Sequence, residues 1–94
     1  MTLAVDAALL GSLQDAARSA GRPGVTATGH VVGACYFNTR YDMAYAVLGA
    51  ATLWELAPGE AVRLRWSNGE ETSTGMPVGC DEMIAEPPGC DVAA

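Results

Sequence analysis

The stretch Leu53–Thr74, LWELAPGEAVRLRWSNGEETST, decides the fold class of this 94-residue chain. Within it, residues 62–67 alternate apolar and polar side chains, and a period of two is typical of a half-buried strand. Pro58-Gly59 fits the central pair of a type II turn. Asn68-Gly69 predicts a hairpin in which both turn residues take positive φ. We therefore expect three antiparallel strands in a row, separated by these two turns.

Upstream, the segment Thr2 to Ala20 predicts an amphipathic helix. Its apolar side chains recur at spacings of three and four residues, and Arg18 lies near the end that the helix dipole favours for a cation. Gly21 and Pro23 predict the stop, with the glycine in a left-handed conformation. Gly11 lowers the intrinsic helix propensity, and we expect it to mark a close approach to the sheet.

Residues 25–37 predict one long strand or two short ones. Gly29 and Gly33 weaken the run and indicate a bulge or a bend. His30 is the only histidine in the chain. An exposed histidine would suit a base or a ligand, but no acidic or cysteine partner lies at a recognisable spacing. We therefore interpret His30 as an ordinary strand residue.

Residues 39–52 fit two patterns. Thr39 and Asp42 resemble a capping box, and the alanine content agrees with a helix. Alternation of large with small side chains favours instead a strand whose large residues face a helix; these are Tyr41, Met43, Tyr45 and Val47. We prefer the strand.

Together these patterns predict an α+β fold, in which an N-terminal amphipathic helix packs on an antiparallel β-meander of about four or five strands. Residues 1–85 are expected to form one domain and residues 86–94 a short flexible tail rich in proline and glycine. No apolar run approaches the roughly 20 residues that cross a bilayer, and no basic leader is present. A cytoplasmic location is therefore expected.

The net charge of −6 comes entirely from the second half of the chain. Residues 54–94 contain eight acidic residues and two arginines, and the chain has no lysine. Such a chain lacks the basic face that nucleic acids and anionic membranes require. The acidic half suits a partner protein with a basic surface, or it serves solubility alone.

Three cysteines raise the question of metal binding. His30, Cys35, Cys80 and Cys90 have the atom types of a zinc site, but they lack the close cysteine pair that such sites use. A disulfide between Cys80 and Cys90 is geometrically possible, although free thiols are expected in a reducing compartment. Motifs for catalysis are missing from the sequence. We expect no metal, no cofactor and no enzymatic activity.

The candidate binding residues are aromatic or acidic: Trp54, Trp66, Tyr41, Tyr45, Glu70 and Glu71. Interfaces favour aromatic residues. The first hypothesis is a small acidic protein-binding module, an inhibitor or accessory factor without catalytic activity. An origin in a phage or mobile element fits such a module by analogy.

The alternative is a small-molecule-binding domain whose aromatic pocket lies between helix and sheet. We expect Tyr36 to line this pocket with Tyr41, Tyr45 and Trp66. Because a small meander leaves two edge strands unpaired, a homodimer formed through a sheet edge or an exposed tryptophan is also expected.

Overall fold

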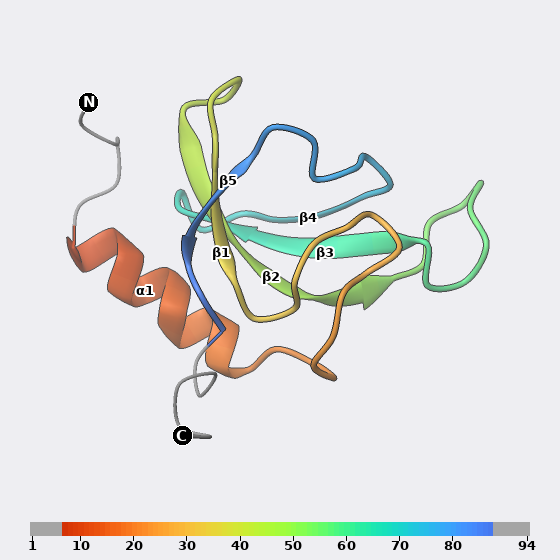
Figure 1. Cartoon of the computed structure of the whole chain (residues 1–94), viewed down its shortest axis with the longest axis horizontal. Coiled ribbons are helices and arrows are strands. Elements are labelled where there is room, and N and C mark those ends of the chain that lie inside the picture. The colour runs from red at the N-terminus through yellow and green to blue at the C-terminus, as the bar shows by residue number, and fades with distance from the viewer. Residues whose placement is uncertain (1–6, 88–94) are drawn as a thin grey trace.

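The computed structural model describes residues 7–87, in which one helix packs on a five-stranded antiparallel sheet (Figure 1). The predicted α+β fold is confirmed. The elements are α1 (Ala7–Arg18), β1 (Cys35–Asn38), β2 (Met43–Ala51), β3 (Ala61–Trp66), β4 (Glu71–Thr74) and β5 (Glu82–Ala85). The first six residues of the chain, which the expected helix includes in part, and residues 88–94 of the expected tail lie outside the described part.

The strand order is β4-β3-β2-β1-β5. The first four strands form a meander, and β5 returns to pair with β1 at the opposite edge from β4. The connection between β4 and β5 therefore crosses from one edge of the sheet to the other. In Figure 1 this crossover is drawn in blue. Together with the strands, it lines the pocket described below.

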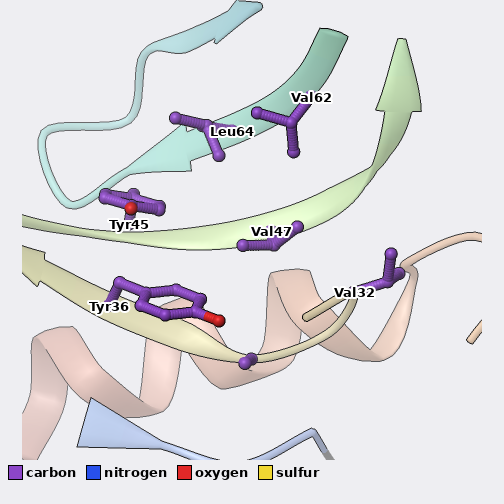
Figure 2. Packing of buried hydrophobic residues seen from close by; sticks show 7 residues of the cluster. Val32, Tyr36, Tyr45, Val47, Val62 and Leu64 are labelled. Carbon is purple, nitrogen blue, oxygen red and sulfur yellow. The ribbon is translucent and has the colours of Figure 1, made fainter. Parts of the chain in front are cut away.

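Because successive side chains of a strand point to opposite faces of the sheet, the buried residues form two clusters, one on each face. On one face, Leu13 and Ala17 of α1 pack against small or flat neighbours on the sheet: Cys35, Phe37, Ala44 and Ala46. The other face carries the larger side chains shown in Figure 2: Val32, Tyr36, Tyr45, Val47, Val62 and Leu64. The expectation that the large side chains face the helix is wrong. Alanine and cysteine allow the helix backbone to approach the sheet closely, so α1 takes the small-residue face.

Residues 43–51 form β2, so the preferred strand interpretation is confirmed. The pairing of β2 with β3 shifts between Val47 and Gly49, which leaves Leu48 as a bulge. The carbonyl of Leu48 accepts a 2.8 Å hydrogen bond from the amide of Gly21. The bulge thus ties the chain that leaves α1 to the central strand.

The two predicted turns occur, with different geometry. Gly59 has φ 83°, and the amide of Glu60 donates to the carbonyl of Ala57, as a type II turn requires. At the second turn only Gly69 has positive φ, so the hairpin has a three-residue loop rather than the predicted two-residue one. Residues 53–56 belong to the β2–β3 loop and not to a strand.

The predicted strand over residues 25–37 is wrong for most of its length. Only Cys35–Asn38 is a strand, preceded by an isolated bridge between Val25 and Val31. Gly29 and Gly33 have φ of 89° and 88°, so the chain bends back on itself twice. The resulting loop crosses the large-residue face beside β2, to which it is joined by a bond from the Gly33 amide to the Val47 carbonyl (Figure 1).

Two expectations about glycines in and after α1 are also wrong. A Cβ placed at Gly11 would meet no atom within 4 Å, so this position makes no close approach. Gly21 does not adopt positive φ, and its amide bonds to the sheet instead. Within residues 7–87 no helix has the length and apolar character needed to span a membrane.

Candidate functional site

A pocket of about 550 Å³ opens on the face of the sheet that α1 leaves uncovered. Its floor is made by strands, with Met43, Tyr45, Leu64, Trp66, Thr72 and Thr74. Its wall is the crossover between β4 and β5, over residues 76–81. Loops rather than a helix lie over this face of the sheet, and they leave the pocket open. The volume lies in the range of small-molecule sites, about 300–1,000 Å³.

Three aromatic side chains meet in this pocket. The rings of Tyr45 and Trp66 are 4.9 Å apart between centroids, and those of Tyr41 and Trp66 are 5.7 Å apart and nearly perpendicular. Tyr41 lies on the turn between β1 and β2 and is 60% exposed. The indole Nε1 of Trp66 donates to the hydroxyl of Thr72 at 2.8 Å, which fixes the indole in the plane it occupies.

A chain of buried hydrogen bonds runs beneath the pocket. The hydroxyls of Thr26 and Thr28 are 2.5 Å apart, Thr28 is 2.6 Å from Nδ1 of His30, and Nε2 of His30 is 3.1 Å from the hydroxyl of Tyr45. Tyr45 donates to the carboxylate of Asp81. His30 is 2% exposed, so these protein groups provide its partners.

The direction of this chain follows from counting protons. Because Tyr45 gives its one proton to Asp81, Nε2 of His30 must be the donor to Tyr45. Nδ1 of His30 then accepts a hydrogen bond from the hydroxyl of Thr28 when the imidazole is neutral. The geometry thus assigns the Nε2–H tautomer to the neutral imidazole of His30.

Burial and charge act on the same groups. Burial, and then the hydrogen bond and charge of Asp81, raise the pKa of the Tyr45 hydroxyl, so this phenol keeps its proton at neutral pH. Burial lowers the pKa of His30 below its usual 6.5, and the charge of Asp81 opposes the effect only partly. Asp81 accepts a second bond from Nδ2 of Asn38 at 2.9 Å. A carboxylate held by two neutral donors therefore lies at the pocket wall.

Chemically, this arrangement is better suited to binding than to proton transfer. The imidazole of His30 is committed to Thr28 and Tyr45, so it is not directed at the thiol of Cys80 on the pocket lining. Tyr45 is held as a hydrogen-bond donor. The expectation that the protein is not an enzyme stays a prediction.

Four of the six predicted binding residues lie together at this pocket: Tyr41, Tyr45, Trp66 and Glu70. Trp54 lies on the β2–β3 loop away from the pocket and is 97% exposed. Glu71 lies on the opposite face of the sheet, where its carboxylate pairs with Arg63 at 2.8 Å and Arg65 at 2.9 Å.

The predicted location of the pocket, between helix and sheet, is wrong. Tyr36 does not line it; its ring stacks on Tyr45 at 5.6 Å, and its hydroxyl accepts from the amide of Val31. The aromatic residues point away from α1 because the odd positions of β2 share the face opposite to the alanines.

Sequence reasoning missed three polar residues at the site: His30, Asn38 and Asp81. A local signal for His30 existed, since Thr26 and Thr28 precede it at spacings of two, and such a run of small polar residues beside a histidine suits a buried network. Asp81 carried no such signal, because only the crossover brings it to Tyr45.

The cysteines do not converge in the described part of the chain. Cys35 is buried on the helix-side face, and burial raises the pKa of its thiol to about 11. Cys80 is exposed, and His30 lies on the opposite face of the sheet from Cys35. Within residues 7–87 no three histidine, cysteine or acidic side chains cluster as metal ligands would. Cys90 lies outside the described residues.

No protein-family model matches the chain, and searches of curated proteins and of solved structures find no significant match.

Proposed function

We propose that this domain binds a small organic molecule in the aromatic pocket formed by Tyr41, Tyr45 and Trp66. The single observation that carries the proposal is the pocket itself: about 550 Å³, walled by loops and floored by aromatic rings. Apolar lining with a few fixed polar groups is typical of small-molecule sites. The fixed polar groups here are Asp81 and the hydroxyl of Thr72.

The buried network supports the proposal because it makes the pocket preformed. Tyr45 is bonded on both sides, to His30 and to Asp81, and Trp66 is bonded to Thr72. Side chains fixed in this way lose little conformational entropy when a ligand arrives. A domain that needed only a stable core would gain nothing from leaving these rings around an open space.

A screen of small aromatic fragments by ¹⁵N-resolved NMR tests the proposal. The two tryptophan indole N–H resonances serve as reporters. A fragment in the pocket is expected to shift the Trp66 resonance and leave that of Trp54 in place. Tyr41→Ala, at an exposed turn, should weaken binding, and Trp54→Ala is the matched control. A diverse screen in which no fragment moves the Trp66 resonance would contradict the proposal.

A second candidate, the acidic protein-binding module, is favoured by Trp54. An indole that is 97% exposed at a loop tip, with Leu56 nearby in sequence and also exposed, has the composition of a binding anchor. We infer that such a partner would have a basic surface, given the net charge of −6. The two candidates use different parts of the molecule, so each is testable without the other.

A further inference from the structure

We infer that the ligand of the aromatic pocket is an organic cation, a small molecule with a protonated amine attached to an apolar or aromatic body. This inference rests on the proposed function and specifies the ligand class of the same site. It follows from what the pocket places together: a fixed carboxylate, a corner of aromatic rings, and a surplus of negative over positive side chains.

The carboxylate of Asp81 is prepared to receive a cation. Each of its oxygens already accepts one bond, Oδ1 from Asn38 and Oδ2 from Tyr45. A carboxylate oxygen can accept more than one hydrogen bond, so both oxygens keep capacity for a donor from the ligand. Both existing donors are neutral, so the negative charge of Asp81 is oriented and not cancelled. Charge-assisted bonds from an ammonium are about twice as strong as neutral ones.

The rings add a second source of attraction for the same charge. The rings of Tyr41 and Trp66 meet at 86° and form a corner, while Tyr45, which has 0% exposure, lies buried beside Trp66 and offers no ring face to a ligand. In a corner, a ligand can contact the face of one ring while lying beside another. Ring faces attract cations within about 6 Å of the centroid, most strongly for tryptophan.

The remaining charges on the pocket lining favour a cation over an anion. Among the described residues that line the pocket, Asp81 and Glu70 are acidic, and Arg40 is the one permanently charged base. Arg40 and Glu70 are both exposed, so water screens both of their charges, and Asp81 is the one partly buried charge among these three. The imidazole of His30 is neutral in the hydrogen-bond chain, so it adds no opposing charge beneath Tyr45. An anionic ligand would meet the partly buried carboxylate of Asp81.

Three probes of similar size and shape test this inference: phenethylamine, 2-phenylethanol and 3-phenylpropanoate, which are cationic, neutral and anionic at neutral pH. Each is titrated while the Trp66 indole N–H resonance is followed, with that of Trp54 as internal reference. We expect the amine to bind about tenfold more tightly than the alcohol, from one charge-assisted bond and a cation–π contact. The propanoate should bind most weakly.

Asp81→Asn should remove most of the amine's advantage over the alcohol and leave only the part that comes from the cation–π contact, while the affinity of the alcohol stays unchanged. Glu55→Gln, on the β2–β3 loop, makes the same change of charge away from the pocket and should have no effect. If Asp81→Asn unfolds the protein, Glu70→Gln at the exposed pocket rim replaces it, with an expected loss of about twofold for the amine alone.

The outcomes separate the two proposals. Equal binding of amine and alcohol, or tighter binding of the propanoate, would overturn the cation inference and leave the pocket as a small-molecule site. The cation inference also fails if fragments from the screen bind but the amines among them have no advantage. If neither the fragments nor the three probes shift Trp66, both proposals fail together.

Discussion

At the scale of single residues, Tyr45 joins the parts of the molecule that matter for the site. Its ring packs against Tyr36 and Trp66, and its hydroxyl accepts from His30 and donates to Asp81. Tyr45 therefore belongs both to the hydrophobic core and to the lining of the pocket. Its removal therefore affects groups that lie far apart in the sequence.

Tyr45→Phe should lower the free energy of unfolding by about 1–3 kcal/mol, because it leaves the buried Nε2–H of His30 without an acceptor and removes one donor from Asp81. Tyr36→Phe is the matched control. The hydroxyl of Tyr36 accepts a single partly buried hydrogen bond from the amide of Val31, so Tyr36→Phe should lower the free energy of unfolding by less than Tyr45→Phe. Denaturant unfolding measures both. Equal losses for the two variants would argue against the network as a major source of stability.

The lowered pKa of His30 predicts a dependence of stability on pH. Above its usual pKa of 6.5 the imidazole is neutral in both states, so His30 makes no pH-dependent contribution. As pH falls below that value, the unfolded chain takes up a proton that the folded protein resists. The free energy of unfolding should therefore fall from about pH 7 downward and level off once the folded-state pKa is passed.

The measurement is a series of denaturant unfolding curves between about pH 7.5 and pH 5.5, a range above most carboxyl titrations. His30→Gln keeps a polar side chain but cannot titrate, so its stability should vary less over the same range. A wild-type curve as flat as that of the variant would show that the imidazole is no harder to protonate when folded.

At the scale of elements, the crossover from β4 to β5 does more than connect two strands. It spans the sheet from edge to edge, and Val78 packs against the large-residue core while its amide donates to the Thr28 carbonyl at 2.9 Å. The loop that carries Thr28 is thereby joined to the crossover. The pocket wall and the histidine network are held by the same contact.

Helix α1 offers a simple test of its own packing. Gly11 adds flexibility to the unfolded chain and makes no close contact, so Gly11→Ala should stabilise the protein by about 1 kcal/mol. Gly69→Ala is the contrasting variant, because φ 93° at that turn is strained for any residue with a Cβ. It should destabilise the protein. Denaturation midpoints of the two variants should move in opposite directions, and a shift of both to lower denaturant would contradict the prediction for α1.

At the scale of the whole molecule, the most exposed aromatic side chain, Trp54, does not line the pocket. Trp54 occupies the β2–β3 loop, and the edge strands β4 and β5 contain four residues each. Short edge strands with acidic residues pair poorly with other chains. We therefore expect self-association of this molecule to involve Trp54 more than the sheet edges.

The homodimer stays a prediction, and it now has a sharper test. Light scattering at high micromolar concentration should give the mass of a dimer, and Trp54→Ala should return the mass to that of a monomer. Glu55→Gln, the neighbouring substitution, should leave the dimer intact. A monomer mass for the wild-type protein at that concentration would rule the homodimer out.

Binding to a basic partner protein predicts a dependence on salt. The Debye length falls from about 10 Å at 0.1 M to 3 Å at 1 M, so association should slow steeply while dissociation changes less. Glu70→Lys should slow association in the same direction. Reversal of Glu71 is unsuitable because that residue pairs with Arg63 and Arg65. Stopped-flow measurement with a partner obtained by affinity capture gives the rates, and rates that do not vary with salt would leave the acidic residues a role in solubility only.

The sequence by itself determined the features that depend on neighbouring residues. The alternation in residues 62–67 and 41–48, the type II turn at Pro58-Gly59 and the helix stripe all predicted elements that the structure contains. The α+β class followed, because the period of each apolar pattern distinguishes a helix from a strand. The sequence also predicted that Tyr41, Tyr45 and Trp66 lie together, and all three line the same pocket.

Only the tertiary structure decided which face of the sheet the helix covers and what the opposite face does. Alternation shows that a strand has two different faces, but it does not show which one receives the helix. The small side chains at Ala44 and Ala46 let α1 approach, and this choice left the aromatic face to loops. Asp81 reaches Tyr45 only because the crossover returns across the sheet. The two residues are 36 positions apart in the sequence. The pocket and its charge depend on that long-range contact, for which no local pattern in the sequence gives a signal.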